Sequence, residues 1–285
     1  MARYPTGPHL PTTTVAPMSQ GERAEPSGTA ATYERDGHVA TITYHRPEAA
    51  NTVNGAMRRD LNAAWERFMA DEEAWVAILT GAGDRHFCGG ADLRDPDGST
   101  GDFAGTFWEV PTVNSFESGL EVFKPTIAAV NGVCLGYGLT AVVSCDFVVA
   151  SDRATFSWPE VTIGIPTIVG AIRLPRKVAW ADAMELLLTG EAIDAQRALD
   201  IGLAWRVVPH DDLMAEARAL ADRLCRAAPL AARATKEVAV RTRDMGWTEA
   251  VRFGETMRRV AGTTDDAAEG RTAWREKRSP EWEGR

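Results

Sequence analysis

The feature that most constrains this sequence is an apolar stretch over residues 126–150, which glycines and polar residues divide into short pieces. Residues 126–130 are apolar and partly β-branched, which is typical of a buried parallel strand. Asn131 and Gly132 follow as a turn, and residues 147–150 repeat the strand pattern. The interruptions argue against a transmembrane helix, which needs about 20 continuous apolar residues. The stretch therefore predicts two buried strands joined through a turn and a short helix.

The short helix is expected to begin in a glycine-rich turn. Gly136 and Gly138 flank Tyr137, and residues 139–144 then span roughly two helical turns. A helix start presents backbone N–H groups and the positive end of the helix dipole, a place suited to an oxyanion or a phosphate. A glycine pair by itself is more often an ordinary turn. A second loop, residues 86–93, also follows a buried strand, and the two loops together favour a binding site.

Glu160 is the carboxylate in the loop after the second strand, where it follows Trp158 and Pro159. A lone glutamate after a proline is usually a solvated loop residue or a helix cap. Two nearby loops that present backbone N–H groups favour a catalytic role for Glu160 instead. When a proton leaves the carbon next to a thioester carbonyl, negative charge collects on the oxygen, and preorganised donors stabilise the enolate. The combination predicts an active site for proton transfer, with Glu160 as the acid–base group.

Three segments together resemble the motif blocks of the crotonase family, also called the enoyl-CoA hydratase/isomerase family. They are HFCGGADL at 86–93, KPTIAAVNGVCLGYG at 124–138 and SWPEVTIGI at 157–165. The similarity extends over about residues 31–283. By this resemblance the oxyanion donors are the backbone N–H groups of Ala91 and Tyr137, and Glu160 matches one of the family's two catalytic glutamates. Thr140 stands at the position of the other glutamate.

The order of elements predicts an α/β fold, because strands and helices alternate before residue 180 and helices alone are expected after it. The resemblance implies a crotonase-like spiral of ββα turns with a C-terminal helical region. We expect a flexible tail over 1–30, the spiral core over 31–225, and a helical region over 226–285 that supplies cover and oligomer contacts. The proline-rich tail cannot bury a core. The resemblance also implies a homotrimer or homohexamer.

Helical spacing of apolar residues predicts an amphipathic helix over 55–70, in which Met57, Leu61, Trp65 and Phe68 share a face. A further helix is expected over 113–123. The remaining elements are strands over 32–35, 38–44 and 75–80 and helices over 182–188, 194–201, 211–227, 231–244, 248–260 and 265–275.

The formal net charge of −9 argues against nucleic-acid binding, which needs a basic surface. Because CoA is anionic and the chain carries a net negative charge, a CoA ligand would need cations placed close to its binding site. The resemblance implies that the substrate and CoA meet the segment 91–94 (Ala91, Asp92, Leu93 and Arg94) and Tyr137. Arg94 could meet CoA phosphates, and Lys277 matches a lysine that reaches a neighbouring subunit's ligand.

The four cysteines show no CxxC pairing, and no signal peptide is visible in the sequence. They are therefore interpreted as reduced thiols of a cytoplasmic protein. No zinc spacing, Walker loop or dinucleotide fingerprint is present, so we expect no metal and no cofactor other than the CoA of the substrate. His86 and Cys88 share one face of a strand, which is the weaker alternative of a nucleophile pair.

The favoured reaction is isomerisation of 3-enoyl-CoA to 2-enoyl-CoA, because one carboxylate can take and return the proton. Thr140 can hydrogen-bond but cannot act as an acid–base group near neutral pH. The alternatives are hydration of 2-enoyl-CoA with another acid such as Glu109 or Glu117, decarboxylation, and thioester hydrolysis. Trp108, Glu109 and Glu117 could line an acyl pocket, although packing or surface roles are more common. A non-catalytic acyl-CoA-binding protein is the alternative from another class.

Overall fold

The structure is a computed structural model that describes residues 30–95, 115–116 and 119–285. It begins with β1 (Ala31–Asp36) and β2 (Val39–Tyr44), which form the expected antiparallel hairpin. Gly37 in the turn has a φ of +58°, a conformation that a residue with a side chain rarely adopts. The tail expected over 1–30 lies almost entirely outside the described residues.

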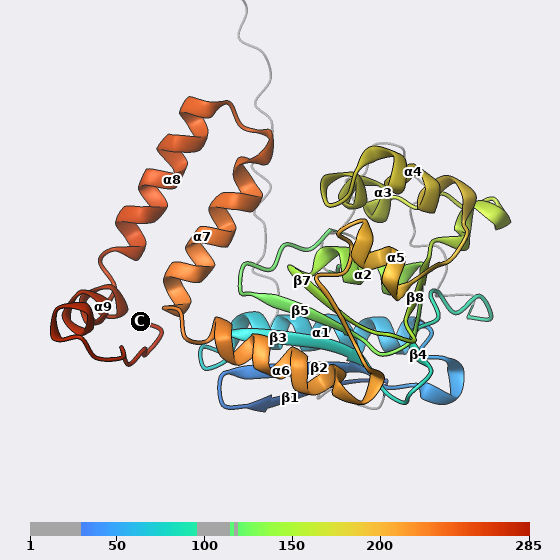
Figure 1. Cartoon of the computed structure of the whole chain (residues 1–285), viewed down its shortest axis with the longest axis horizontal. Helices are drawn as coiled ribbons and strands as arrows, with labels where there is room; N and C mark the ends of the chain where they lie inside the picture. The colour runs from blue at the N-terminus through green and yellow to red at the C-terminus, as the bar shows by residue number, and fades with distance from the viewer. Residues whose placement is uncertain (1–29, 96–114, 117–118) are drawn as a thin grey trace, which may run out of the picture.

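The main sheet has six strands in the order β1-β2-β3-β5-β7-β10 (Figure 1). All pairs after the first are parallel. The strands not yet given are β3 (Val76–Gly81), β5 (Thr126–Val130), β7 (Phe147–Ser151) and β10 (Arg206–Val208). The two strands predicted from the apolar stretch are therefore confirmed as the neighbours β5 and β7 at the centre of this sheet.

Both faces of β5 are covered, which explains its continuous apolar sequence. Ile127 and Ala129 belong to the core cluster that includes the buried side of α6 (Leu213–Leu224). Ala128 and Val130 belong to the cluster that includes the buried side of α1 (Gly55–Ala70). This alternation is the period of two of a strand, and it sandwiches the sheet between two helical layers.

A second, four-stranded sheet has the order β4-β6-β8-β9. Its strands are short: β4 (His86–Cys88), β6 (Val133–Leu135), β8 (Thr155–Ser157) and β9 (Ile193–Asp194). Each of β4, β6 and β8 follows one strand of the main sheet, so the chain advances as successive strand pairs. The turn into β6 requires Gly132, because a Cβ there would lie 2.2 Å from the Arg85 carbonyl oxygen.

The remaining helices are short until residue 212. They are α2 (Tyr137–Ser144), α3 (Val169–Arg173), α4 (Trp180–Thr189) and α5 (Ala195–Asp200). The short 3₁₀ helices are η1 (Pro47–Ala49), η2 (Pro159–Ile163), η3 (Leu174–Arg176), η4 (His210–Asp212) and η5 (Thr242–Asp244). The C-terminal helices are α7 (Pro229–Arg241), α8 (Trp247–Ala261) and α9 (Asp265–Glu276).

Three expectations about the elements were wrong. The strand β6 intervenes between the turn at Asn131 and the helix, and β9 and β10 interrupt the part expected to be all helical. The helix expected over 113–123 is not formed at 115–116 or 119–123, where the chain is turn and irregular structure. Gly119 has a φ of +95°, which ends any right-handed helix there.

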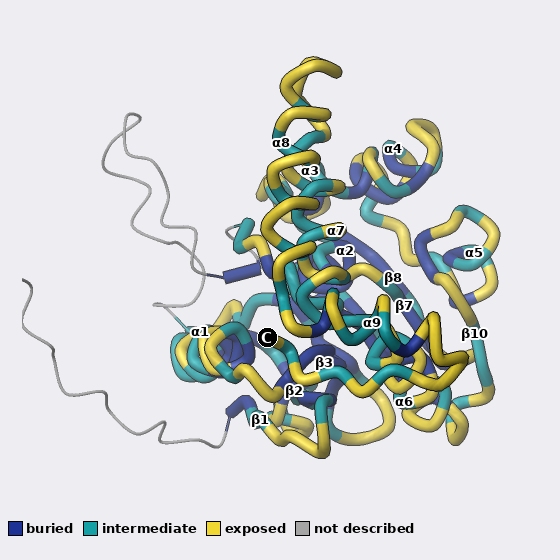
Figure 2. Tube along the Cα trace, turned by 90° about the vertical axis from the view of Figure 1, so that its left-hand side faces the viewer, coloured by how far each residue is buried: buried dark blue, intermediate teal, exposed yellow. Residues whose placement is uncertain are grey.

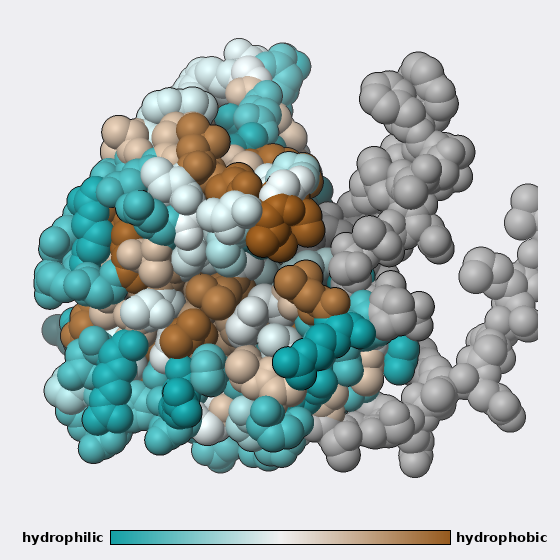
Figure 3. All heavy atoms as spheres, turned by 90° about the vertical axis from the view of Figure 1, so that its right-hand side faces the viewer, coloured by the Kyte–Doolittle hydropathy of each residue, from teal (hydrophilic) through white to brown (hydrophobic). Residues whose placement is uncertain are grey.

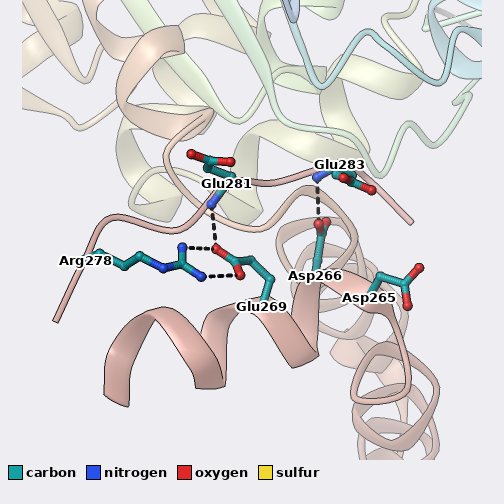
Figure 4. A pocket seen from close by; sticks show the side chains of 6 residues that line it. All are labelled: Asp265, Asp266, Glu269, Arg278, Glu281 and Glu283. Atoms are coloured by element: carbon teal, nitrogen blue, oxygen red, sulfur yellow. Dashed lines mark hydrogen bonds and ion pairs between the residues drawn. The ribbon is translucent and has the colours of Figure 1, made fainter. Parts of the chain in front are cut away.

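The helices α7 and α8 form a hairpin that extends away from both sheets (Figure 1). α8 is mostly exposed (Figure 2), and neither α7 nor α8 contains a buried residue. The tail after α9 folds back on that helix (Figure 4): Arg278 pairs with Glu269, and the backbone N–H groups of Glu281 and Glu283 donate to Glu269 and Asp266. In the described residues, no helix is long and apolar enough to cross a membrane.

Candidate active site

Glu160 is the second residue of η2, the turn that follows β8 of the second sheet. The end of β8 is held on both sides. The Ser157 hydroxyl donates to the Gly190 carbonyl (2.8 Å), and the Gly136 N–H donates to the Ser157 carbonyl (3.0 Å). Pro159 fixes the first residue of the turn. The carboxylate thus stands on a short, well-anchored segment beside the start of α2.

The Glu160 carboxylate lies against the backbone of Gly136. A Cβ on Gly136 would be 2.6 Å from Glu160 Oε1, and this glycine has a φ of +50°. Both facts exclude a side chain at this position. Tyr137 follows as the first residue of α2, so its backbone N–H lies at the positive end of the helix dipole. The glycine-rich turn predicted from the sequence and the predicted acid–base group are therefore adjacent.

The pKa of Glu160 is raised above its ordinary value by burial, and its own backbone N–H and the hydroxyl of Thr167 lower it in part. Its Oε2 atom is buried and has no hydrogen-bond partner of good geometry among the described residues. A carboxylate in such surroundings is a stronger base than one in water. Perturbed carboxylates of this kind are concentrated at functional sites.

The segment 86–93 also packs against the start of α2. Gly90 has a φ of +89°, and a Cβ there would lie 3.4 Å from the Leu135 carbonyl oxygen, one residue before Gly136. A Cβ on Gly138 would lie 2.6 Å from the Cβ of Cys88, so the start of α2 rests on the end of β4. Ala91 pairs with Val53 as an isolated parallel bridge, which fixes the loop. The structure thus brings the Ala91 and Tyr137 segments together.

Thr140 has a partner that the sequence did not predict. The Trp158 indole N–H donates to Thr140 Oγ1 at 3.2 Å, and Trp158 is fully buried. A buried indole N–H without an acceptor is costly. The Thr140 hydroxyl therefore satisfies a core tryptophan, instead of standing free in place of a carboxylate.

The segment 91–94 contains one anchored acid and two exposed side chains. The Asp92 carboxylate accepts from Arg46 and from the Thr52 hydroxyl, each at 3.3 Å. Leu93 is 66% exposed, and Arg94 is also exposed. Asp92 therefore fixes the loop, while Leu93 and Arg94 are available to a ligand.

The remaining candidates lie away from this site, lie outside the described residues or are buried. Lys277 caps the C-terminus of α9 and is exposed; α9 lies at the opposite end of the molecule from α4 (Figure 1), so Lys277 does not join this chain's own site. Glu109, Glu117 and Trp108 lie outside the described residues. His86 and Cys88 do not form an accessible pair, because the Cys88 side chain is fully buried beneath α2.

Two side chains near the site were missed from the sequence. Arg58 donates to the Tyr137 hydroxyl at 2.9 Å, although its spacing on α1 indicated only a polar helix face. Thr167 lies beside the Glu160 carboxylate. No motif signals either contact. Arg58 and Tyr137 lie far apart in the sequence, and Thr167 lies in a loop that has no recognisable pattern.

Apolar side chains gather on the face that carries α4 (Figure 3). The exposed large apolar residues of η2, α3, α4 and the loops between them are Ile163, Ile165, Ile168, Ile172, Trp180 and Leu188. Patches of this kind mark binding or interaction surfaces.

Comparison with known proteins identifies the family of the chain. A family model described as enoyl-CoA hydratase/isomerase matches residues 34–285. The chain is 37% identical to (E)-benzylidenesuccinyl-CoA hydratase of Thauera aromatica, over 89% of this chain and 98% of the relative. It is 38% identical to carnitinyl-CoA dehydratase of Proteus mirabilis, over 87% of this chain and 96% of the relative.

Solved structures show the same fold. The crystal structure of an enoyl-CoA hydratase from Mycobacterium tuberculosis superposes with a TM-score of 0.81 at 33% identity, covering 90% of this chain and all of the other. An enoyl-CoA hydratase/isomerase from Mycobacterium paratuberculosis gives a TM-score of 0.79 at 37% identity, covering 91% of this chain and 100% of the other. The expected crotonase-like α/β fold is confirmed. The chain belongs to the enoyl-CoA hydratase/isomerase family and is an enzyme of that family that acts on CoA thioesters.

Proposed function

We propose that this enzyme adds water reversibly to the double bond of a 2-enoyl-CoA, with Glu160 as its acid–base group. The observation that carries the proposal is the half-buried Glu160 carboxylate, which lies against Gly136 at the start of α2 and whose Oε2 atom is buried. Two relatives at 37% and 38% identity are named as a hydratase and a dehydratase. These names favour water addition or removal over the isomerisation that the sequence favoured.

The proposed reaction uses one carboxylate twice. Glu160 takes a proton from water as the water oxygen bonds to C3, and the electrons of the C2–C3 double bond move to the thioester oxygen. The backbone N–H groups of Ala91 and Tyr137 stabilise the resulting enolate. The protonated Glu160 then delivers its proton to C2, which restores the carboxylate. The reverse sequence dehydrates a 3-hydroxyacyl-CoA, and neither direction needs a cofactor beyond the CoA of the substrate.

Isomerisation of 3-enoyl-CoA remains a second candidate, and one observation favours it. Thr140 stands at the second-glutamate position and its hydroxyl already accepts from Trp158. Glu160 alone can move a proton from C2 to C4 through the same enolate. This reaction needs no bound water, which distinguishes it from hydration.

The CoA moiety is proposed to lie along Leu93 and Arg94, because both are exposed next to the loop that holds Ala91. Arg94 supplies a cation for the phosphates. Lys277 is proposed to reach the ligand of a neighbouring subunit in a trimer or hexamer, since its own site lies too far away (Figure 1). Cys88, Cys134 and Cys145 are buried and form no disulfide, which supports the expected cytoplasmic location.

The decisive test incubates the purified protein with 2-enoyl-, 3-enoyl- and malonyl-type CoA esters and records product masses and regiochemistry. We expect 2-enoyl-CoA to gain one water at C3. Isomerisation without water uptake would select the second candidate. Loss of carbon dioxide or release of free CoA would replace both, and ligand-induced thermal stabilisation without turnover of any ester would indicate a non-catalytic binding protein.

A further inference from the structure

Two oxygen atoms beside each other are buried and unpartnered at the candidate site. Glu160 Oε2 and Thr167 Oγ1 are both buried, and neither has a hydrogen-bond partner of good geometry among the residues that the structure describes. Thr167 lies in the loop between η2 and α3, where its hydroxyl is close enough to the Glu160 carboxylate to lower the pKa of that group. Buried polar atoms are nearly always hydrogen-bonded in folded proteins, so an unpartnered pair at a reactive carboxylate points to a ligand.

The orientation of Thr167 follows from its packing. A Cβ on Gly170 would lie 2.7 Å from Thr167 Cγ2 and 2.8 Å from the Trp158 ring, so the methyl group of Thr167 occupies the space that this glycine leaves. Trp158 is itself held by its hydrogen bond to Thr140. With the methyl group fixed against Gly170, the hydroxyl is the part of Thr167 that faces Glu160.

A hydration reaction needs a water molecule held by two groups, so that one lone pair points at C3. The Thr140 hydroxyl is already the acceptor of the Trp158 indole. Glu160 Oε2 and Thr167 Oγ1 can each accept one hydrogen of the same water. The proton bonded toward Oε2 is the one transferred as the C3–O bond forms, while Thr167 keeps its own proton.

We propose that Thr167 is a further catalytic residue, whose hydroxyl and Glu160 Oε2 together bind the water that adds to C3. The inference rests on the proposed hydration, because isomerisation and simple exchange of the C2 proton need no such water. Thr167 then directs the reaction to hydration, because it holds the water that adds to C3 while Glu160 forms the enolate.

The test uses a matched pair of variants with two readouts. Thr167→Val keeps the methyl group against Gly170 and loses the hydroxyl, whereas Thr167→Ser keeps the hydroxyl. The readouts are hydration of 2-enoyl-CoA and exchange of the C2 proton of a saturated acyl-CoA with D₂O, both measured at a pH above the acid limb of the wild-type profile. We expect Thr167→Val to lose roughly 10- to 100-fold in hydration, the rate factor of one hydrogen bond to a developing charge, with a much smaller loss of exchange. Thr167→Ser should stay close to wild type in both.

A third variant separates this inference from the proposed function. Glu160→Gln should lose hydration and exchange together, and hydration at the wild-type rate in this variant would sink the proposed role of Glu160 itself. The role of Thr167 is overturned if Thr167→Val hydrates normally, or if its hydration and exchange fall in parallel. Removal of the hydroxyl should also move the acid limb of exchange to higher pH, because the hydroxyl lowers the pKa of Glu160. Circular dichroism confirms that each variant is folded.

Discussion

The helices α1 and α8 have similar lengths and similar amphipathic sequences, but only one of them buries its apolar face. α1 has 16 residues and buries Met57, Leu61, Ala64, Trp65 and Phe68. α8 has 15 residues and buries none. Trp247 and Val260 of α8 are 83% and 62% exposed. Amphipathic spacing therefore predicts a helix and an apolar face, but it does not say which surface covers that face.

This difference suggests separate roles for the part around α1 and for the C-terminal helices. Around α1 the chain covers its own apolar surface, and the part of the chain that contains the two sheets also holds Glu160 against Gly136. In the C-terminal helices the large apolar side chains Trp247, Val260 and Trp274 remain exposed, which fits the proposed role in subunit contact. The predictions below test each half separately.

The largest expected effect is on turnover, from a change that leaves packing alone. Glu160→Gln should lower kcat/KM by roughly 10²–10⁴-fold, since it removes one positioned acid–base group while keeping the shape of the side chain. Steady-state kinetics with the active enoyl-CoA measures the loss. Thermal unfolding should show no destabilisation, and a large loss of stability would mean that the carboxylate is structural.

A matched pair of phenylalanines compares the two halves in stability. Phe68→Ala removes a fully buried ring that packs edge-on against Trp65, and we expect a loss of about 3–5 kcal/mol in unfolding free energy. Phe253→Ala on α8 removes a half-buried ring and should cost about 1 kcal/mol or less in dilute protein. Denaturant unfolding measures both. Equal losses would show that the C-terminal helices belong to the same cooperative core.

The same division explains what could be predicted from the sequence. β5 and α1 were predicted closely because their apolar spacing is local and strong. The two- and three-residue strands β6, β9 and β10 were not, because such strands exist only through pairing with distant partners. Glycine at position 119 stopped a helix that the surrounding composition favoured.

The candidate site divides in a similar way. Motif resemblance pointed to Glu160, Ala91 and Tyr137, which lie in segments that the structure brings together. It treated Thr140 as a missing acid, whereas the structure shows an acceptor for Trp158. Thr167 could not be found, because its relation to Glu160 depends on how a loop without a motif packs against Gly170.

The C-terminal helices should control assembly. Wild-type protein is expected to sediment as a trimer or hexamer at micromolar concentration. Trp247→Ala should weaken association by about tenfold or more, since exposed tryptophans that become buried at interfaces often contribute over 2 kcal/mol. Sedimentation velocity over a concentration series measures this. A wild-type protein that stays monomeric would remove the proposed role of these helices.

The pH dependence tests the core half alone. Glu160 must be ionised to accept a proton, and burial raises its pKa above the ordinary value of 4.5. Activity should therefore fall about tenfold per pH unit below that raised pKa. The folded state binds this proton more tightly than the unfolded state does. The contribution of protonated Glu160 to the free energy of unfolding is therefore fully present below the pKa of Glu160 in the unfolded chain. It is lost as pH rises through the pKa of Glu160 in the folded protein. Glu160→Gln should abolish this stability change, and an unchanged pH dependence of unfolding would assign the proton elsewhere.

The smallest expected effect concerns two exposed cations, one in the core and one in the C-terminal helices. It therefore compares the two parts of the molecule directly. Arg94 lies on the core loop beside Ala91, and Lys277 caps α9 at the far end of the chain. Each contact with CoA phosphate would be solvent-exposed, so Arg94→Ala and Lys277→Ala should each raise KM only a few-fold, by about 0.2–1 kcal/mol. Both effects should shrink with added salt. If Lys277 serves a neighbouring subunit, its effect must vanish in the dissociated Trp247→Ala background, while that of Arg94 persists. A Lys277 effect that survives dissociation would place its ligand contact within its own chain, and that would require the C-terminal helices to move from the position that they have here.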